Sequence, residues 1–178
     1  MASHELIQKY GVLIVFFNTF CASLGLPLPA VPTLLAVGSG LALASDDPYA
    51  TLLGLTTMVA AASIGAVLGD MVWFHVGRRY GENTLRGVLR LFVSGESHLP
   101  RTQRLLERWG GRILIVARWI PGLSLFVVPL CGATAVKLRA FLIYDCIGVI
   151  LWAAIGVGTG ELFASRIDVI WSVAPRLI

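Results

Sequence analysis

Four ionisable side chains lie within otherwise apolar stretches of this sequence, and their types suit them to chemistry. They are Asp70, Arg118, Asp145 and, nearer the end of its stretch, Glu161. Placing a charged group inside an apolar segment carries a large desolvation cost, so each of these residues needs a partner or a function. We therefore expect them either to pair with one another or to bind a charged ligand.

Arg118 is the most informative of the four because it precedes a break in the backbone pattern. Pro121 and Gly122 break a helix three and four residues later, and backbone N–H groups at such a break are free to help bind an anion. A guanidinium also stays charged and grips phosphate with a planar fork. The sequence thus predicts a phosphate-binding role. The alternative is structural: Arg118 pairs with Asp70 or Asp145 and holds two halves of the protein together, while either aspartate could instead accept protons.

Composition sets the environment of these residues. Of the 178 residues, 57% are hydrophobic and 13% are charged, whereas an ordinary soluble domain has about 25% charged residues. A globule of this size cannot bury so much apolar surface from water, so lipid must be the solvent for much of it. The apolar stretches recur along the whole chain, which excludes a soluble domain with one anchor. We predict a single membrane domain over residues 1–178.

Positive charge is concentrated between residues 78 and 112. This segment has eight arginines and three glutamates, a local balance of +5 in a chain of net charge +4. Short arginine-rich loops remain on the cytoplasmic side, so we place it there, with Arg78 and Arg79 contacting anionic headgroups. Residues 101–112 can form an amphipathic helix on the membrane surface. Such a segment is more typical of lipid contact than of nucleic-acid binding, and we expect no nucleic-acid partner.

The cysteines and histidines give no sign of a metal or cofactor. The three cysteines lie in apolar runs without CxxC spacing, and the three histidines are scattered along the chain. We therefore expect no disulfide framework, no metal site and no cofactor. An enzyme would need a nucleophile within reach of a general acid or base. Because no histidine lies in the proline-broken segments at 27–45 and 113–131, we expect no catalytic site.

Five apolar stretches can be marked, at residues 11–26, 28–45, 51–76, 113–131 and 140–163. Only the third and fifth have the length and interior of a spanning helix, which needs about 20 residues. The second contains Pro29 and Pro32, and the fourth contains Pro121 and Gly122. Broken backbone at membrane depth must be buried in protein or line a wet cavity. We therefore expect residues 27–45 and 113–131 to be re-entrant hairpins, each entering and leaving on one side.

The order of the segments predicts an internal repeat. A broken segment followed by a spanning helix occurs in residues 11–77 and again in residues 113–163, and residues 63–68 resemble residues 146–151. One crossing per half would turn the second copy upside down, and paired broken segments in inverted halves indicate a substrate site at the midplane. The predicted fold is all-α: an inverted repeat of two re-entrant hairpins, each followed by a transmembrane helix, with an amphipathic cytoplasmic helix between them.

This ordered set of motifs resembles the DedA family, the bacterial branch of the VTT, or SNARE-associated, membrane proteins. The resemblance covers roughly residues 15–160 and rests on the sequence around the hairpin prolines, on the aspartates and on the glycines that follow them (Pro29 to Gly38, Gly69-Asp70, Gly77 to Gly81, Arg118 to Gly122, Gly132, Phe141, Asp145, Gly148 and Trp152). It implies two opposed re-entrant hairpins in the bacterial cytoplasmic membrane. It also implies movement of lipids such as undecaprenyl phosphate or phospholipids across the bilayer, with proton coupling in some members.

The sequence also departs from the family pattern. The acid that many members carry two positions after the hairpin proline is Val31 here, an earlier acid falls near Asn18 and Thr19, and the second arginine of the other hairpin is Ser124. Asp70 and Asp145 would have to replace the missing acids, or the protein would be an uncoupled scramblase.

The leading hypothesis is a flippase or scramblase for a phosphate-bearing lipid. Its predicted phosphate site lies where the two hairpin tips meet, and its residues are Arg118, Pro121, Gly122, Ser124, Pro29 and Pro32. The alternative is a non-transporting protein that organises the membrane or maintains the envelope. The sequence leaves open the identity of the lipid and whether the protein forms a homo-oligomer.

Overall fold

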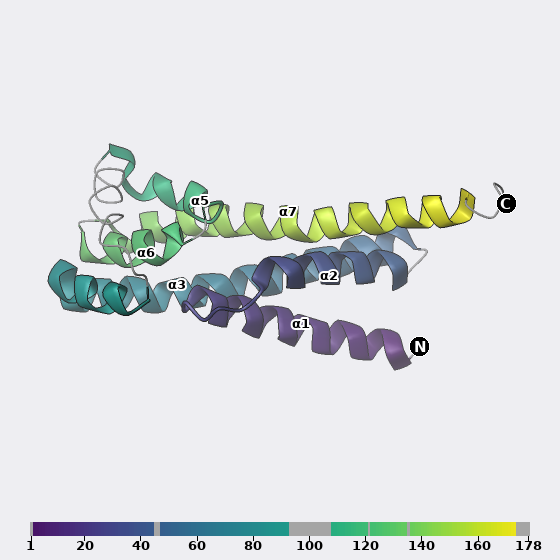
Figure 1. The fold of residues 1–178 in the computed structure, drawn as a ribbon, viewed down its shortest axis with the longest axis horizontal. Coiled ribbons are helices and arrows are strands. Elements are labelled where there is room, and N and C mark those ends of the chain that lie inside the picture. The colour runs from purple at the N-terminus through teal and green to yellow at the C-terminus, as the bar shows by residue number, and fades with distance from the viewer. Residues whose placement is uncertain (1, 45–46, 93–107, 121, 135, 174–178) are drawn as a thin grey trace.

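The computed structural model of this protein describes residues 2–44, 47–92, 108–120, 122–134 and 136–173, with the backbone alone at 2–9, 44, 82–92 and 165–173. Every element assigned in these ranges is a helix (Figure 1), so the all-α class is confirmed. The helices are α1 (Ala2–Ser23), α2 (Ala30–Ala44), α3 (Pro48–Phe92, kinked at Gly81), η1 (Gly110–Arg112), α5 (Ile113–Ala117), α6 (Leu123–Ala133) and α7 (Leu138–Val173).

Two of these helices are long and apolar enough to cross a membrane. They are Pro48–Gly81 within α3 and Leu138–Ala164 within α7, of 34 and 27 residues, against the roughly 20 residues that a crossing needs. The start of α3 is defined locally, because Asp47 Oδ1 accepts a hydrogen bond from the Tyr49 N–H at 3.0 Å and Pro48 occupies the first turn. The two spanning helices predicted from the third and fifth apolar stretches are confirmed in length and composition.

The shorter apolar helices form two helix-turn-helix units. In the first half α1 and α2 are joined by a turn over residues 24–29, and in the second half α5 and α6 are joined by a turn that contains Arg118 and Gly122. Figure 1 shows the turn-containing ends of both units directed toward the middle of the molecule from opposite ends of its long axis. The prediction that residues 27–45 turn back on themselves is wrong. That stretch forms the single helix α2, which has no break after Pro29. The other helix of the unit is α1, which contains the first apolar stretch.

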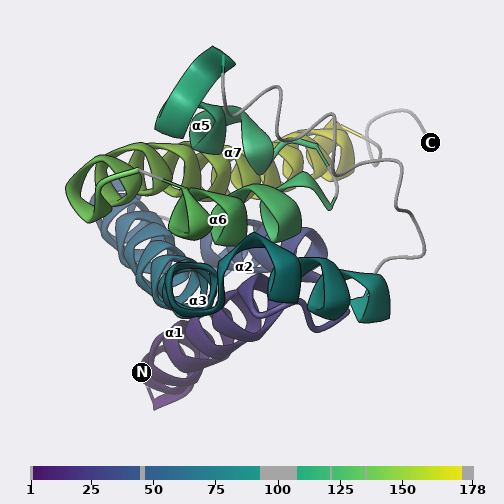
Figure 2. The same ribbon diagram turned by 90° about the vertical axis from the view of Figure 1, so that its left-hand side faces the viewer.

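Each helix-turn-helix unit packs against both long helices. In the first unit α1 lies along α3 and α2 lies along α7, while in the second unit α5 lies along α7 and α6 lies along α3. Figure 2, turned by 90° from Figure 1, shows α6 next to α3 and α5 next to α7. In each unit, therefore, one short helix packs against the long helix of its own half and the other packs against the long helix of the other half.

Glycines allow α2 and α7 to touch backbone to backbone. A Cβ added at Gly38 would lie 2.0 Å from the carbonyl oxygen of Val157, and one at Gly160 would lie 2.2 Å from the carbonyl oxygen of Leu35. Both distances are far below van der Waals contact, so any side chain at either position would push the two helices apart.

The contact between α3 and α6 uses the same arrangement. A Cβ at Gly77 would lie 2.0 Å from the carbonyl oxygen of Pro129, and one at Gly132 would lie 2.0 Å from that of Phe74. The contact positions on α3 and α7 correspond at a spacing of 83 residues, as between Gly77 and Gly160. Those on α2 and α6 correspond at a spacing of 94 residues, as between Gly38 and Gly132. The local resemblance between residues 63–68 and 146–151 has the same spacing of 83, so it marks positions that pack alike.

Many large apolar side chains remain on the outer surface of the helices, including Ile64, Ile143, Leu162 and Phe163. A water-soluble protein of this size would not expose so many. The buried apolar side chains form two clusters, one around Phe74 and Phe141 and the other around Leu34 and Met58. The buried polar residues, including Asp70, belong to neither cluster.

Candidate functional site

Arg118 directly follows the short helix α5, in the turn that precedes α6. The turn needs Gly122, whose φ of 79° is left-handed and is rarely adopted by other residues. The first half provides a similar turn after Ser23, with Gly25 at φ 94°. The two turns are close, because a Cβ at Gly25 would lie 3.4 Å from the Cδ2 atom of Leu125 on α6. Two glycine turns from opposite halves therefore bring Ser23 and Arg118 together.

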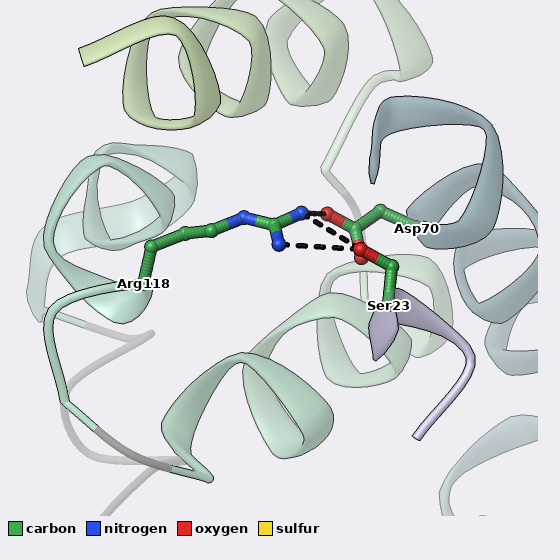
Figure 3. Close-up of polar contacts among 3 residues, drawn as sticks. All are labelled: Ser23, Asp70 and Arg118. Atoms are coloured by element: carbon green, nitrogen blue, oxygen red, sulfur yellow. Dashed lines mark hydrogen bonds and ion pairs between the residues drawn. The ribbon is translucent and has the colours of Figure 1, made fainter. Parts of the chain in front are cut away.

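The guanidinium of Arg118 joins three parts of the chain (Figure 3). Its Nη2 forms an ion pair and hydrogen bond with Asp70 Oδ2 in the middle of α3. Both Nη1 and Nη2 also donate hydrogen bonds to the Ser23 hydroxyl, each at 3.2 Å. The Arg118 side chain is only 10% exposed, so these contacts replace most of its hydration. The ion pair expected from the sequence is present, and its carboxylate is Asp70.

α7 contributes the remaining members of this cluster. The Trp152 ring lies under the guanidinium, with its centroid 5.7 Å from Arg118 Cζ, close enough for a cation–π interaction. The Asp145 side chain is buried and lies close to Asp70. We refer to Ser23, Asp70, Arg118, Asp145 and Trp152 as the central cluster.

The central cluster contains polar atoms that its own contacts do not satisfy. Among the described residues, Arg118 Nε and Asp145 Oδ2 are buried without a hydrogen-bond partner. Leaving such atoms unpaired in a low-dielectric interior is unfavourable by about 1–3 kcal/mol each. The cluster therefore has capacity to bind a further polar group.

The other predicted phosphate-site residues are less closely associated with Arg118. Ser124 is half-buried in the first turn of α6, while Pro29 and Pro32 are exposed around the start of α2. None of the three forms a hydrogen bond to Arg118 within the described part of the chain. Gly122 acts through its backbone conformation. Pro121, and most of the predicted amphipathic helix at 101–112, lie outside the described residues.

The two arginines assigned to headgroup contact differ. Arg78 is exposed, but its Nη2 donates to the carbonyl of Val136 and its guanidinium stacks on Phe74 with 5.0 Å to the ring centroid. Arg79 is exposed and lines a surface hollow on α3. Arg78 is thus engaged in joining α3 to the start of the second long helix, whereas Arg79 faces outward.

Sequence reasoning missed Ser23 and did not assign a role to Trp152. Trp152 follows Asp145 by seven residues, which is two helical turns and therefore the same face; this spacing could have linked it to the cluster. Ser23 has a weaker signal, because a serine at a helix end is common and only the approach of the two turns makes its hydroxyl a partner of Arg118.

Comparison with known proteins gives the family. The family model of the VTT domain matches residues 28–162, and Protein DedA of Escherichia coli (strain K12) is 30% identical over 167 residues, covering 90% of this chain and 74% of that protein. The chain belongs to the DedA family of membrane proteins. An uncharacterized membrane protein of Mycobacterium tuberculosis (strain H37Rv) is 35% identical, covering 86% of this chain and 71% of that protein. One from Synechocystis is 31% identical, covering 86% and 67%. No solved structure matches the chain.

The family resemblance predicts acids at Val31 and near Asn18 and Thr19, where this DedA-family protein has none. Val31 is 48% exposed on α2, and the Thr19 hydroxyl donates to the carbonyl oxygens of its own helix. Asn18 Oδ1 is buried without a partner among the described residues. The buried carboxyl groups of the described chain are therefore Asp70 and Asp145, both on the long helices.

Proposed function

We propose that this DedA-family protein moves a phosphate-bearing lipid, such as undecaprenyl phosphate or a phospholipid, across the bacterial cytoplasmic membrane. In this proposal α3 and α7 cross the bilayer and the two helix-turn-helix units are re-entrant hairpins of an inverted repeat, entering from opposite faces. Their turns meet near the midplane, where transporters with inverted repeats bind their substrates. The partners are membrane lipids with anionic headgroups, and no covalent step is required.

One observation carries the proposal: Arg118 is buried at the meeting point of the two turns and held by groups that a phosphate could replace. Asp70 supplies one negative charge and Ser23 one hydroxyl. A lipid phosphate offers the same charge-assisted acceptors with additional oxygens, and the unpartnered Arg118 Nε adds a donor. Exchange of Asp70 for phosphate on the guanidinium would therefore conserve charge pairing while the lipid headgroup passes the midplane.

The two aspartates provide a way to control that exchange. Asp70 and Asp145 are both buried and lie close to each other, and two such carboxyl groups can share one proton, which one of them donates to the other. With one shared proton, Asp70, Asp145 and Arg118 are together neutral. A second proton would neutralise Asp70, weaken its ion pair and release Arg118 to a phosphate.

A second function is favoured by a specific observation. Arg118 links three helices, through Asp70 of α3, Ser23 at the end of α1 and Trp152 of α7. An arginine so engaged could serve only to lock two halves together. The protein would then organise the membrane without transporting lipid.

Lipid flipping by the purified protein separates the two functions. The protein is reconstituted into liposomes containing a trace of phospholipid labelled with nitrobenzoxadiazole, either phosphatidylglycerol or phosphatidylcholine, and dithionite is added outside. Transport exposes the inner-leaflet label, so reduction proceeds well beyond the half seen in protein-free liposomes. Reduction that stops at half, in vesicles shown to contain folded protein, would favour the membrane-organising function.

The same liposomes test proton coupling. Wild-type flipping should change in rate when an inside-acid or inside-alkaline pH gradient is imposed. Asp145→Asn removes one carboxyl group while keeping the size of the side chain, so it should still flip lipid but respond to the gradient less than half as strongly. An unchanged response in this variant would remove Asp145 from the coupling step.

A further inference from the structure

A second feature of the molecule lies on its outer surface, away from the central cluster. A groove of about 670 Å³ runs between α3 and α7, and its lining includes Leu55, Ser63, Leu68, Cys146 and Ala154. Its volume falls within the range of roughly 300–1,000 Å³ that is usual for sites of small molecules. If α3 and α7 cross the bilayer as in the proposed function, the mouth of this groove between them faces hydrocarbon.

A second hollow of about 600 Å³ continues along α3 toward Gly81. Leu68 lines both hollows, so they meet at this residue. Beyond Leu68 the second hollow is lined by apolar Val72 and then by His75, Arg79 and Tyr80. The surface is thus apolar over most of its length and carries a permanent positive charge at one end.

The part of this track between Leu68 and Arg79 has the length of one lipid leaflet. From Leu68 to Arg79 the helix rises about 16 Å, which is half of the roughly 30 Å hydrocarbon core and so the depth of one leaflet. From Leu68 to Leu55 it rises about 20 Å further. A headgroup at Arg79 would therefore lie at the membrane interface while its chain reaches the groove between α3 and α7.

We propose that this track is a lipid-binding site for one membrane lipid with an anionic headgroup. Arg79 pairs with the headgroup phosphate, Tyr80 and His75 flank it, and an apolar chain follows α3 past Leu68 into the groove beside Ser63 and Cys146. Charge complementarity selects the anionic headgroup, since Arg79 is exposed and, unlike Arg78, makes no contact that ties it to another described residue. The site does not depend on transport and would be occupied in a protein that moves no lipid.

Native mass spectrometry of the full chain in detergent tests the headgroup end. The protein is stripped of lipid and incubated with phosphatidylglycerol or phosphatidylcholine, and the bound copies are counted. A contact between one arginine and an anionic headgroup is worth about 1 kcal/mol, or about fivefold in affinity. We expect wild type to prefer phosphatidylglycerol by about that factor and Arg79→Gln to lose the preference. Arg139→Gln is the matched control, because Arg139 is also exposed but does not line the track.

The chain end is tested by filling the groove. Ala154→Phe and, on the other wall, Ala60→Phe should each reduce the binding of both lipids at least fivefold, whereas Ala36→Phe, exposed on α2 outside the groove, should have no effect. Equal binding of the two lipids by wild type, or full binding by both groove-filling variants, would overturn the proposal. So would an oxidative cross-link between two copies through Cys146 in membranes of Cys21→Ser protein, because a second copy would then occupy the groove.

Discussion

Ser23 accepts hydrogen bonds from both terminal nitrogens of Arg118, and Asp70 neutralises the charge. At the scale of single residues this is a buried ion pair whose two members come from different halves of the chain. Removing one member of such a pair leaves the other charge uncompensated, whereas removing both can be nearly neutral. This difference separates the structural role of the pair from its role in binding.

Asp70→Asn should therefore destabilise the protein, and a second substitution should restore it. Loss of one partner of a buried pair typically lowers stability by about 3–5 kcal/mol, or about 6–20 °C in Tm for a chain of this size. The double variant Asp70→Asn, Arg118→Met should regain most of that Tm but flip no lipid. Thermal unfolding of the detergent-solubilised protein, followed by tryptophan fluorescence, measures the first effect. Recovery of flipping by the double variant would rule out Arg118 as the phosphate ligand.

Arg118→Lys should reduce lipid flipping at least about tenfold while the protein still folds. Lysine keeps the charge that pairs with Asp70, but it lacks the planar fork that binds Asp70 and Ser23 together or two phosphate oxygens at once. Loss of one charge-assisted hydrogen bond, about 1.5–3 kcal/mol, corresponds to at least that factor. The dithionite assay on reconstituted protein measures it.

The control for this variant is Val31→Ala. Val31 stands where the family resemblance predicts an acid, but it is exposed on α2 and offers only packing, so the smaller side chain should leave flipping within twofold of wild type. Normal flipping by Arg118→Lys would assign Arg118 to the scaffold.

At the scale of helices, the sequence indicated the two long elements well and the short ones less well. Length and hydropathy were sufficient to predict α3 and α7, because a spanning helix needs only an uninterrupted apolar run. The first helix-turn-helix unit was misplaced because prolines marked its expected turn. Pro29 and Pro32 instead lie around the first turn of α2, where proline fits a helix, and the chain turns at Gly25.

Part of the central cluster could be predicted from the sequence. Arg118 and its acidic partner followed from the cost of a charge in an apolar segment. The choice of Asp70 over Asp145, and the presence of Ser23, depend on where the two turns meet, which is a tertiary contact that no local pattern encodes. The register of the repeat was visible in the sequence only as a short similarity between residues 63–68 and 146–151, whereas the structure shows it in the close backbone contacts that glycines make with carbonyl groups of the neighbouring helix.

Two neighbouring glycines of α2 provide a matched test of that contact. Gly38→Ala would place a Cβ 2.0 Å from the Val157 carbonyl oxygen, so α2 and α7 must separate and stability should fall by about 1–3 kcal/mol. Gly40→Ala meets nothing within 4 Å and should raise stability by about 0.5–1 kcal/mol through helix propensity. Tm values of the purified variants compare them. Equal effects of the two substitutions would contradict the close packing of α2 on α7.

At the scale of the whole molecule, the two ends differ in charge. α3 ends and α7 begins at one end of the long axis, and the other end holds the start of α3 (Figure 1). Arg78, Arg79, Lys137 and Arg139 lie at the first end and are exposed. Short basic segments stay in the cytoplasm, so this end is expected to be cytoplasmic and the first helix-turn-helix unit is expected to enter from outside.

Cysteine accessibility tests this orientation and the re-entrant hairpins together. Single cysteines are introduced as Ser3→Cys and Tyr49→Cys, which flank the first unit, and as Arg108→Cys and Lys137→Cys, which flank the second. Tyr49 is 82% exposed, and Arg108 and Lys137 are also exposed, so replacing them should not disturb packing. A membrane-impermeant maleimide should label positions 3 and 49 in intact cells and positions 108 and 137 only in inverted vesicles.

The reason for this expectation is geometric, because helices of 11–15 residues such as α2 and α6 rise only about 17–23 Å and cannot cross a core of about 30 Å. Each unit must then return to the face from which it entered. If the two flanks of either unit were labelled from opposite faces, that unit would cross the bilayer and the two turns could not meet as opposed hairpin tips.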